Sequence, residues 1–170
     1  MHVTPRHRLI SSLGAVLIAA LPLSRAAAVT TTSTMNVTAQ VQATCTVSAA
    51  DLNFGAYQGG AASNLDATTT VTATCPPGQG YTIGLNEGTG TGATVANRLM
   101  TLSSGGATLN YGLFSDSARA THWTDIGGAN VVAGTGDGAG QPITVYGRIP
   151  SGQNVRTGTY EDTITVTMNY

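Results

Sequence analysis

The chain has 170 residues, a formal net charge of −1 and 9% charged residues, and it contains no lysine. This charge balance excludes electrostatic binding of nucleic acid or of anionic lipid, because both require a strongly basic surface. The length predicts a single domain after processing.

The first 28 residues have the features of a secretory signal peptide. Basic residues at positions 6–8 precede an apolar stretch over residues 9–23, and three alanines at 26–28 fit a small-residue cleavage site. The apolar stretch is shorter than the roughly 20 residues that a membrane-spanning helix needs, which favours cleavage over anchoring. Cleavage after residue 28 leaves 4 arginines and 8 acidic residues, a formal charge of −4. We therefore expect export, with no direct membrane insertion of the mature chain.

An alternating segment opens the mature chain. Over residues 34–43, apolar and polar side chains take turns, a period typical of a strand with one buried face. The apolar positions are Met35, Val37, Ala39, Val41 and Ala43. Two interpretations are open: the strand pairs within its own chain, or it completes the sheet of a neighbouring molecule.

Two cysteines, Cys45 and Cys75, predict one disulfide. Exported chains with an even number of cysteines tend to pair them, and two cysteines allow one intrachain connectivity. A two-cysteine metal site is the alternative, but His122 is the only histidine that remains after cleavage. Closing a loop of about 30 residues stabilises a fold by roughly 3–4 kcal/mol in the chain-entropy model.

Short alternating segments, separated by turn residues, make up the middle of the chain. They are, in order, residues 67–75, 81–85, 98–102, 109–114 and 143–149. A Ser-Ser-Gly-Gly sequence predicts a hairpin between the third and the fourth, and the glycine-rich residues 127–141 predict a long irregular loop. Helical periodicity nowhere exceeds one turn, so the pattern indicates an all-β sandwich.

The last segment, residues 160–170, has the most regular alternation. Its apolar face carries Ile164, Val166, Met168 and Tyr170, and the other face carries Thr and Asn. We expect one strand here that ends the sheet and needs a partner, because an unpaired edge exposes its N–H and C=O groups. The alternating segment 34–43 of a neighbouring copy is the partner that we expect.

The chain contains no recognisable catalytic pattern. A serine hydrolase needs Ser, His and an acid, whereas His122 is the single mature histidine and no Gly-x-Ser-x-Gly sequence occurs. The glycine repeat around Asp137 lacks both the helix that follows a phosphate loop and the further copies of a calcium repeat. Trp123, Tyr111 and Tyr146 are candidates for a sugar-binding surface, but we expect most aromatic residues to pack in the core. We expect no enzymatic activity and no cofactor or metal.

The order of several short motifs resembles the spore coat protein U domain family, which includes subunits of archaic chaperone–usher pili. The motifs are Ala-Thr-Cys-Thr-Val, Leu-Asn-Phe-Gly, Thr-Ala-Thr-Cys-Pro, Leu-Asn-Tyr-Gly-Leu-Phe-Ser-Asp, Val-Tyr-Gly-Arg-Ile-Pro and the terminal Asp-Thr-Ile-Thr-Val-Thr-Met-Asn-Tyr. The resemblance covers residues 29–170. It implies an immunoglobulin-like β-sandwich that is incomplete, with six strands, because its last strand is missing.

The resemblance also implies how such subunits assemble. A periplasmic chaperone lends the missing strand, an outer-membrane usher passes subunits to the fibre, and the N-terminal strand of the next subunit replaces the chaperone's. On this sequence it implies a donor strand within residues 29–43 and a sandwich domain over residues 44–170, with a disulfide between Cys45 and Cys75. The donor side chains would be Met35, Val37, Ala39 and Val41, and the acceptor groove would be walled by Ile164, Val166, Met168 and Tyr170.

The expected function is a structural subunit of a secreted surface fibre that supports adhesion or biofilm formation. Its expected partners are neighbouring copies of the same or related subunits, the periplasmic chaperone and the outer-membrane usher. The expected location is a cell-surface fimbrium, reached through the periplasm. The alternatives are a self-contained secreted β-sandwich that binds carbohydrate or another surface ligand, and a spore coat component.

Overall fold

The computed structural model of the protein describes residues 26–170, so residues 1–25 of the predicted signal peptide lie outside the described residues. The chain divides into two units, with the boundary after Ala39. Residues 26–44 contain no strand and no turn, and every side chain among them is exposed. Within residues 26–170, no helix has the length and apolar character needed to cross a bilayer.

All strands of the described residues are antiparallel, which confirms the predicted all-β class. The nine strands are β1 (Thr46–Ala49), β2 (Leu65–Thr74), β3 (Gly80–Leu85), β4 (Arg98–Leu102), β5 (Thr108–Phe114), β6 (Val132–Thr135), β7 (Gly140–Ile149), β8 (Tyr160–Glu161) and β9 (Val166–Asn169). The prediction of six strands was wrong. Two short strands, β1 and β6, were not recognised, and the predicted C-terminal strand is divided into β8 and β9.

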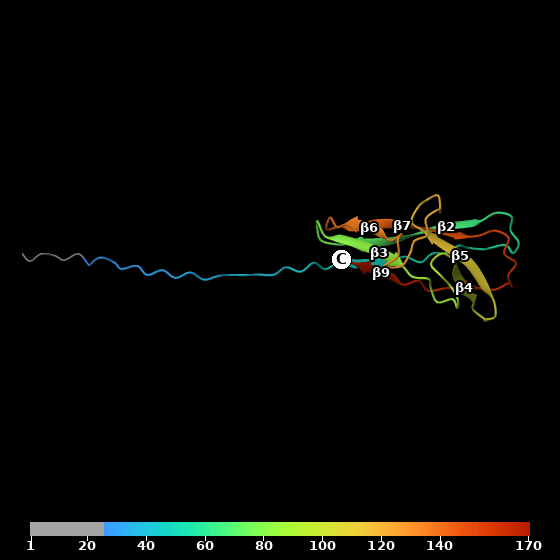
Figure 1. The fold of residues 1–170 in the computed structure, drawn as a ribbon, viewed down its shortest axis with the longest axis horizontal. Coiled ribbons are helices and arrows are strands. Elements are labelled where there is room, and N and C mark those ends of the chain that lie inside the picture. Colours follow the sequence, from blue (N-terminus) through green and yellow to red (C-terminus); the bar gives the residue numbers. More distant parts are fainter. Residues whose placement is uncertain (1–25) are drawn as a thin grey trace, which may run out of the picture. The chain divides into compact units, whose positions relative to one another are not determined.

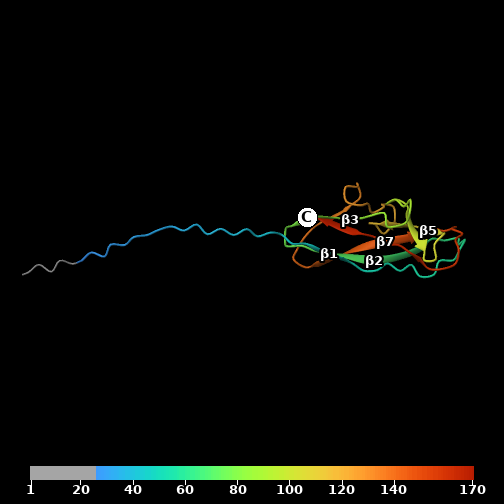
Figure 2. The same cartoon turned by 90° about the horizontal axis from the view of Figure 1, so that it is seen from below.

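The strands form two sheets. One has the order β1-β2-β7-β5-β4-β8, and the other has the order β6-β3-β9 (Figure 1). Figure 2 shows β1, β2 and β7 in one layer and β3 in the other. The longest pairing joins β2 to β7 from Leu65, opposite Ile149, to Thr74, opposite Gly140. These two strands therefore form the longest antiparallel ladder of the larger sheet.

The core lies between the two sheets and follows the alternation of the strands. In β2, Val71 and Ala73 are buried, whereas the alternating threonines Thr70, Thr72 and Thr74 are only partly covered. Trp123 lies outside the strands but is fully buried, and its indole Nε1 donates a hydrogen bond to the Ile83 carbonyl at 2.8 Å. Tyr111 is buried as well. The expectation that most aromatic residues pack in the core is therefore confirmed for these two residues.

The glycine content of residues 127–141 predicted a loop, and this prediction was only partly correct. The predicted hairpin of β4 and β5 is present, but the predicted loop over residues 127–141 contains β6, which pairs with β3. Gly134 lies opposite Tyr81 in that pairing, and a Cβ at position 134 would collide with the tyrosine ring. Glycine is unfavourable in strands in general, yet here it is required because an aromatic ring packs directly over the backbone.

The expected single strand over residues 160–170 is also wrong, because the chain changes sheets within it. β8 pairs with β4 of the larger sheet, and β9 pairs with β3 of the smaller one. Between them, the Asp162 carboxylate accepts hydrogen bonds from the Thr89 amide at 2.7 Å, the Thr89 hydroxyl at 2.8 Å and the Tyr111 hydroxyl at 2.7 Å. These bonds fix the position at which the chain passes from one sheet to the other. β8 and β9 keep the same alternation of apolar and polar residues, so the sequence pattern does not indicate the passage.

Candidate functional site: an open apolar groove

An apolar groove lies between the two sheets. It consists of two adjoining cavities of about 300 and 680 Å³ that share a set of lining residues. The shared residues are Asp51, Leu52, Phe54, Met100 and Tyr160. The four apolar ones among them are only partly buried, although they pack against the core. The sandwich therefore leaves part of its interior uncovered.

Two strand edges border this opening. β1 is paired only with β2, and β9 is paired only with β3, so each has one edge without a strand partner in the described chain. The two strands lie near one another but form no ladder. Beyond them, residues 51–54 and residues 160–166 contribute to the lining of the groove. The free N–H and C=O groups of such edges favour the addition of another strand.

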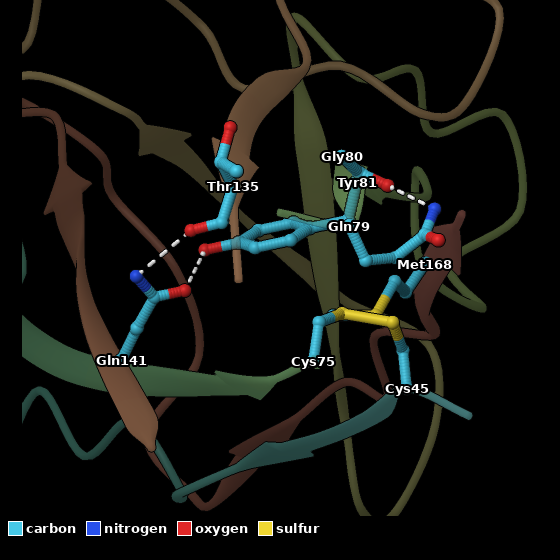
Figure 3. The surroundings of a disulfide bond; sticks show 8 residues. All are labelled: Cys45, Cys75, Gln79, Gly80, Tyr81, Thr135, Gln141 and Met168. Atoms are coloured by element: carbon cyan, nitrogen blue, oxygen red, sulfur yellow. Dashed lines mark hydrogen bonds between the residues drawn. A yellow bond between two sulfur atoms is a disulfide. The ribbon is translucent and has the colours of Figure 1, made fainter. Parts of the chain in front are cut away.

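A disulfide closes the sandwich at one end. Cys45 and Cys75 are bonded, as predicted, and the Met168 Sδ lies 4.0 Å from the Cys75 Sγ (Figure 3). This is a packing contact between sulfur atoms, because a disulfide sulfur has no proton to donate. The disulfide fixes the start of β1 to the end of β2 and therefore anchors one border of the groove.

The predicted acceptor residues divide into two pairs. Ile164 and Val166 line the groove, next to residues from both sheets. Met168 packs against the disulfide, and Tyr170 follows β9 with 58% of its surface exposed. Neither of these two lines the groove. The alternation placed all four on one face, but the groove extends past only part of that face.

The predicted donor residues lie in the exposed N-terminal segment. Met35, Val37 and Val41 are 83%, 80% and 94% exposed, and Ala39 is exposed as well. Such exposure is unusual for three large apolar side chains on one face of a short alternating segment. Their donor role remains a prediction.

A buried arginine, which the sequence analysis missed, binds the backbone of Leu85, a residue that lines the groove. Arg98 is 0% exposed and donates hydrogen bonds of 2.8 Å to the carbonyl oxygens of Asn86, Val95, Leu85 and Trp123. Burial lowers the pKa of its guanidinium group, because desolvation disfavours the charged form. The arginine thereby joins three separate chain segments. An arginine in an alternating strand gives no sequence signal for this role.

Tyr111 and Asp162 form a polar contact in the wall of the smaller cavity. Burial raises the pKa of the Tyr111 hydroxyl, and the hydrogen bond that it donates to Asp162 raises it further. The ring of Phe54 meets the ring of Tyr111 edge to face, with the centroids 6.1 Å apart. These two polar groups of the lining are therefore already paired with each other, whereas Asp51 and Glu161, which also line this cavity, are exposed.

His122 is in a setting that does not favour catalysis. Its ring lies 4.4 Å from the ring of Phe114, and within residues 26–170 its Nδ1 is buried without a hydrogen-bond partner. Burial lowers the pKa of the imidazole, with a smaller contribution from the positive charge of Arg98. In the part of the chain that the structure describes, no three His, Cys, Asp or Glu residues lie together in a way that would hold a metal ion.

The aromatic candidates for a sugar-binding surface are not available as a group. Trp123 and Tyr111 are buried, and Arg119 lies over the ring of Tyr146 at 5.6 Å. The same arginine is 3.3 Å from Asp66, which also binds Arg148 through two hydrogen bonds of 2.7 and 2.9 Å. The bonds from Arg148 lower the pKa of the Asp66 carboxyl. The only partly exposed ring of the three is thus already in contact with a cation.

Comparisons with known proteins identify chains that are similar in fold and in sequence. A solved structure with the same fold is a chain of the CsuC–CsuE chaperone–tip adhesion subunit pre-assembly complex from the archaic chaperone–usher Csu pili of Acinetobacter baumannii. The TM-score is 0.56 and the identity 23%; the match covers 76% of this chain and 40% of the solved chain. A curated relative, "Protein U" of Myxococcus xanthus, is 32% identical over 164 residues, or 86% of this chain and 89% of the relative.

The family model for the spore coat protein U domain matches residues 31–167, which include the exposed alternating segment from residue 34, strands β1 to β8 and the first two residues of β9. Together with the Myxococcus relative, this match leaves one conclusion: the chain belongs to the spore coat protein U domain family.

Proposed function

We propose that this protein is a structural subunit of a chaperone–usher surface fibre and that it polymerises by donor-strand complementation. The observation that carries the proposal is the presence, in one chain, of an uncovered apolar groove and an uncovered apolar strand. The groove is bordered by the free edges of β1 and β9, and residues 34–43 have the alternation of a strand but no partner in the described chain. The segment can provide the strand that the groove lacks, and the groove can cover the apolar side chains of the segment.

The energetics favour this pairing. A donor of about eight residues spans roughly 26 Å in an extended conformation. Burying Met35, Val37 and Val41 contributes up to about 1.5–3 kcal/mol for each side chain. The donor backbone forms hydrogen bonds with the free strand edges, and its alternate side chains enter the groove between Leu52 and Ile164.

The connection between the donor and β1 favours an acceptor in another molecule. Only Thr44 and Cys45 separate residue 43 from the start of β1. A return of the donor along β1 would need a two-residue hairpin turn, which favours Asn-Gly or Asp-Gly and disfavours Thr-Cys. Cys45 is also held in the disulfide. The contact is therefore head to tail, and a contact of this kind that does not close continues as a fibre.

The same groove gives the expected order of partners. A periplasmic chaperone occupies it first, an outer-membrane usher exchanges subunits, and the donor of the next copy replaces the chaperone. The relation in fold to a chain from a chaperone–tip adhesion subunit complex supports the first of these steps, the binding of a chaperone. The fibre is located on the cell surface, where it supports adhesion or biofilm formation.

A pair of neighbouring substitutions tests the donor assignment. Val37→Asp places a charge on the face that enters the groove, and Thr38→Asp places the same charge on the opposite face. We expect Val37→Asp to abolish fibres, because a carboxylate in an apolar groove is not compensated, and Thr38→Asp to retain them. Fibre yield is measured by electron microscopy and by fractionation of sheared surface material. Equal yields from the two variants would contradict the donor assignment.

Deletion of residues 29–43 separates polymerisation from folding. The deleted chain, expressed together with its chaperone, should fold and form the Cys45–Cys75 disulfide, yet add no further subunit to a fibre. If the deleted chain failed to fold with the chaperone present, the segment would be an intrachain strand, and the proposal would fail.

A further inference from the structure

The donor segment contains one residue whose chemistry can change after export. Met35 is the only sulfur-containing residue between residues 29 and 44, and it is 83% exposed. The other two methionines of the mature chain are partly buried: Met100 lines the groove, and Met168 packs against the disulfide (Figure 3). An oxidant that meets the unassembled subunit therefore reaches Met35 first.

We propose that Met35 is an oxidation site through which peroxide prevents a subunit from entering the fibre. This inference rests on the proposed function, because it requires residue 35 to enter the groove of another copy. In the unassembled subunit the thioether is accessible. In the fibre the same side chain is covered by the groove of its neighbour, so oxidation affects the addition of subunits and leaves existing contacts in place.

The reaction needs only a peroxide. A lone pair of the Met35 Sδ attacks one peroxide oxygen, the O–O bond breaks, and a sulfur–oxygen bond forms. The proton of the attacked oxygen moves to the departing oxygen, which leaves as water or as an alcohol. The sulfur loses two electrons and the peroxide gains them. The product, methionine sulfoxide, is polar, whereas the thioether is apolar.

The groove provides few hydrogen-bond donors for a sulfoxide oxygen. Its wall is formed largely by apolar side chains from both sheets: Leu52, Phe54, Val71, Leu85, Met100, Leu113, Val145, Ile164 and Val166. The hydroxyl donors of the same lining are already used: Tyr111 donates to Asp162, and Thr69 donates to backbone carbonyl oxygens. The carboxylates of Asp51 and Glu161, which also belong to this lining, offer only acceptors. A sulfoxide oxygen in this position loses its water without gaining a donor. The expected result is a five- to hundredfold weaker insertion, at about the cost of an uncompensated buried polar group.

Hydrogen peroxide and four forms of the full mature chain test the proposal. Subunits in complex with their chaperone are treated, freed of peroxide and then allowed to polymerise, and peptide masses report which methionines carry oxygen. The readout is the ratio of fibre yields with and without treatment. We expect this ratio to fall about five- to hundredfold in the wild type and in Met168→Leu, and to stay near one in Met35→Leu. Met35→Gln, which mimics the sulfoxide, should polymerise poorly without any oxidant.

Two controls make the outcomes distinct. Preformed fibres treated in the same way should show little oxidation of Met35 and no loss of length. The proposal is overturned if Met35→Leu is as sensitive as the wild type, or if oxidised Met35 is found in subunits that polymerise normally. Normal fibres from Val37→Asp would instead contradict the assignment of residues 34–43 as the donor. That result would overturn the proposed function, whereas the two results above would overturn only the role of Met35 oxidation.

Discussion

Strand β2 and the segment 34–43 have nearly the same pattern, small apolar residues alternating with Thr and other polar residues, but opposite surroundings. β2 is paired with β1 on one edge and with β7 on the other, and Val71 in its middle is 1% exposed. Val37, in the middle of the other segment, is 80% exposed. A period of two thus specifies a face that needs to be covered, and it does not specify which chain supplies the cover.

The same charge placed in the two segments gives the largest contrast. Val71→Asp buries a carboxylate in the core and should lower the free energy of unfolding by more than about 4 kcal/mol. Val37→Asp should change the same quantity in the unassembled chain by less than about 0.5 kcal/mol. Urea denaturation of the two processed chains measures the difference. Similar losses in both would mean that the segment is part of the fold.

Removing the disulfide acts at the boundary between the two regions. Cys45 is the first buried residue after the exposed segment, and its bond to Cys75 closes a loop with a sequence separation of 30. The double variant Cys45→Ser, Cys75→Ser should lose about 3–4 kcal/mol of unfolding free energy in the chain-entropy model. Denaturation of the oxidised wild type in parallel provides the control, and an unchanged midpoint would contradict the prediction.

Substitution of Arg98 measures how much of the stability of the sandwich depends on the hydrogen bonds of this buried side chain. Arg98→Met keeps the aliphatic volume but removes the donors to four carbonyl oxygens, and we expect a loss of about 3 kcal/mol. Arg156→Met, at an exposed position, is the matched control and should change stability by less than about 0.5 kcal/mol. Thermal denaturation followed by circular dichroism distinguishes the two; equal melting temperatures would argue against the structural role of Arg98.

The smallest expected effect is a dependence on pH that belongs to the sandwich alone, since residues 34–43 contain no titratable side chain. The pKa of His122 is lowered in the folded chain, so the unfolded chain binds the proton more readily. Stability from this group is present above its ordinary pKa of about 6.5 and is lost as the pH falls below it. His122→Gln should flatten the curve of unfolding free energy between pH 7.5 and pH 5. An unchanged slope would assign the effect to another group.

Most strands of the sandwich were predictable because local chemistry and tertiary packing agree there. Residues 81–85 and 109–114 alternate, are bounded by turn residues and bury one face, so their positions follow from the sequence. The disulfide followed from the number of cysteines. The groove was predictable only in outline. Ile164 and Val166 line it, whereas Met168 belongs to the disulfide end, and the alternation does not distinguish these positions.

The sequence by itself determined the all-β class, the pairing of Cys45 with Cys75 and the alternation of residues 34–43, because each depends on local periodicity or on composition. Only the tertiary structure decided that Arg98 is buried, that β6 forms within a glycine-rich stretch and that the C-terminal segment crosses between sheets at Asp162. These features depend on acceptors, rings and strand edges contributed by residues distant along the chain, and no local pattern records where those residues come together.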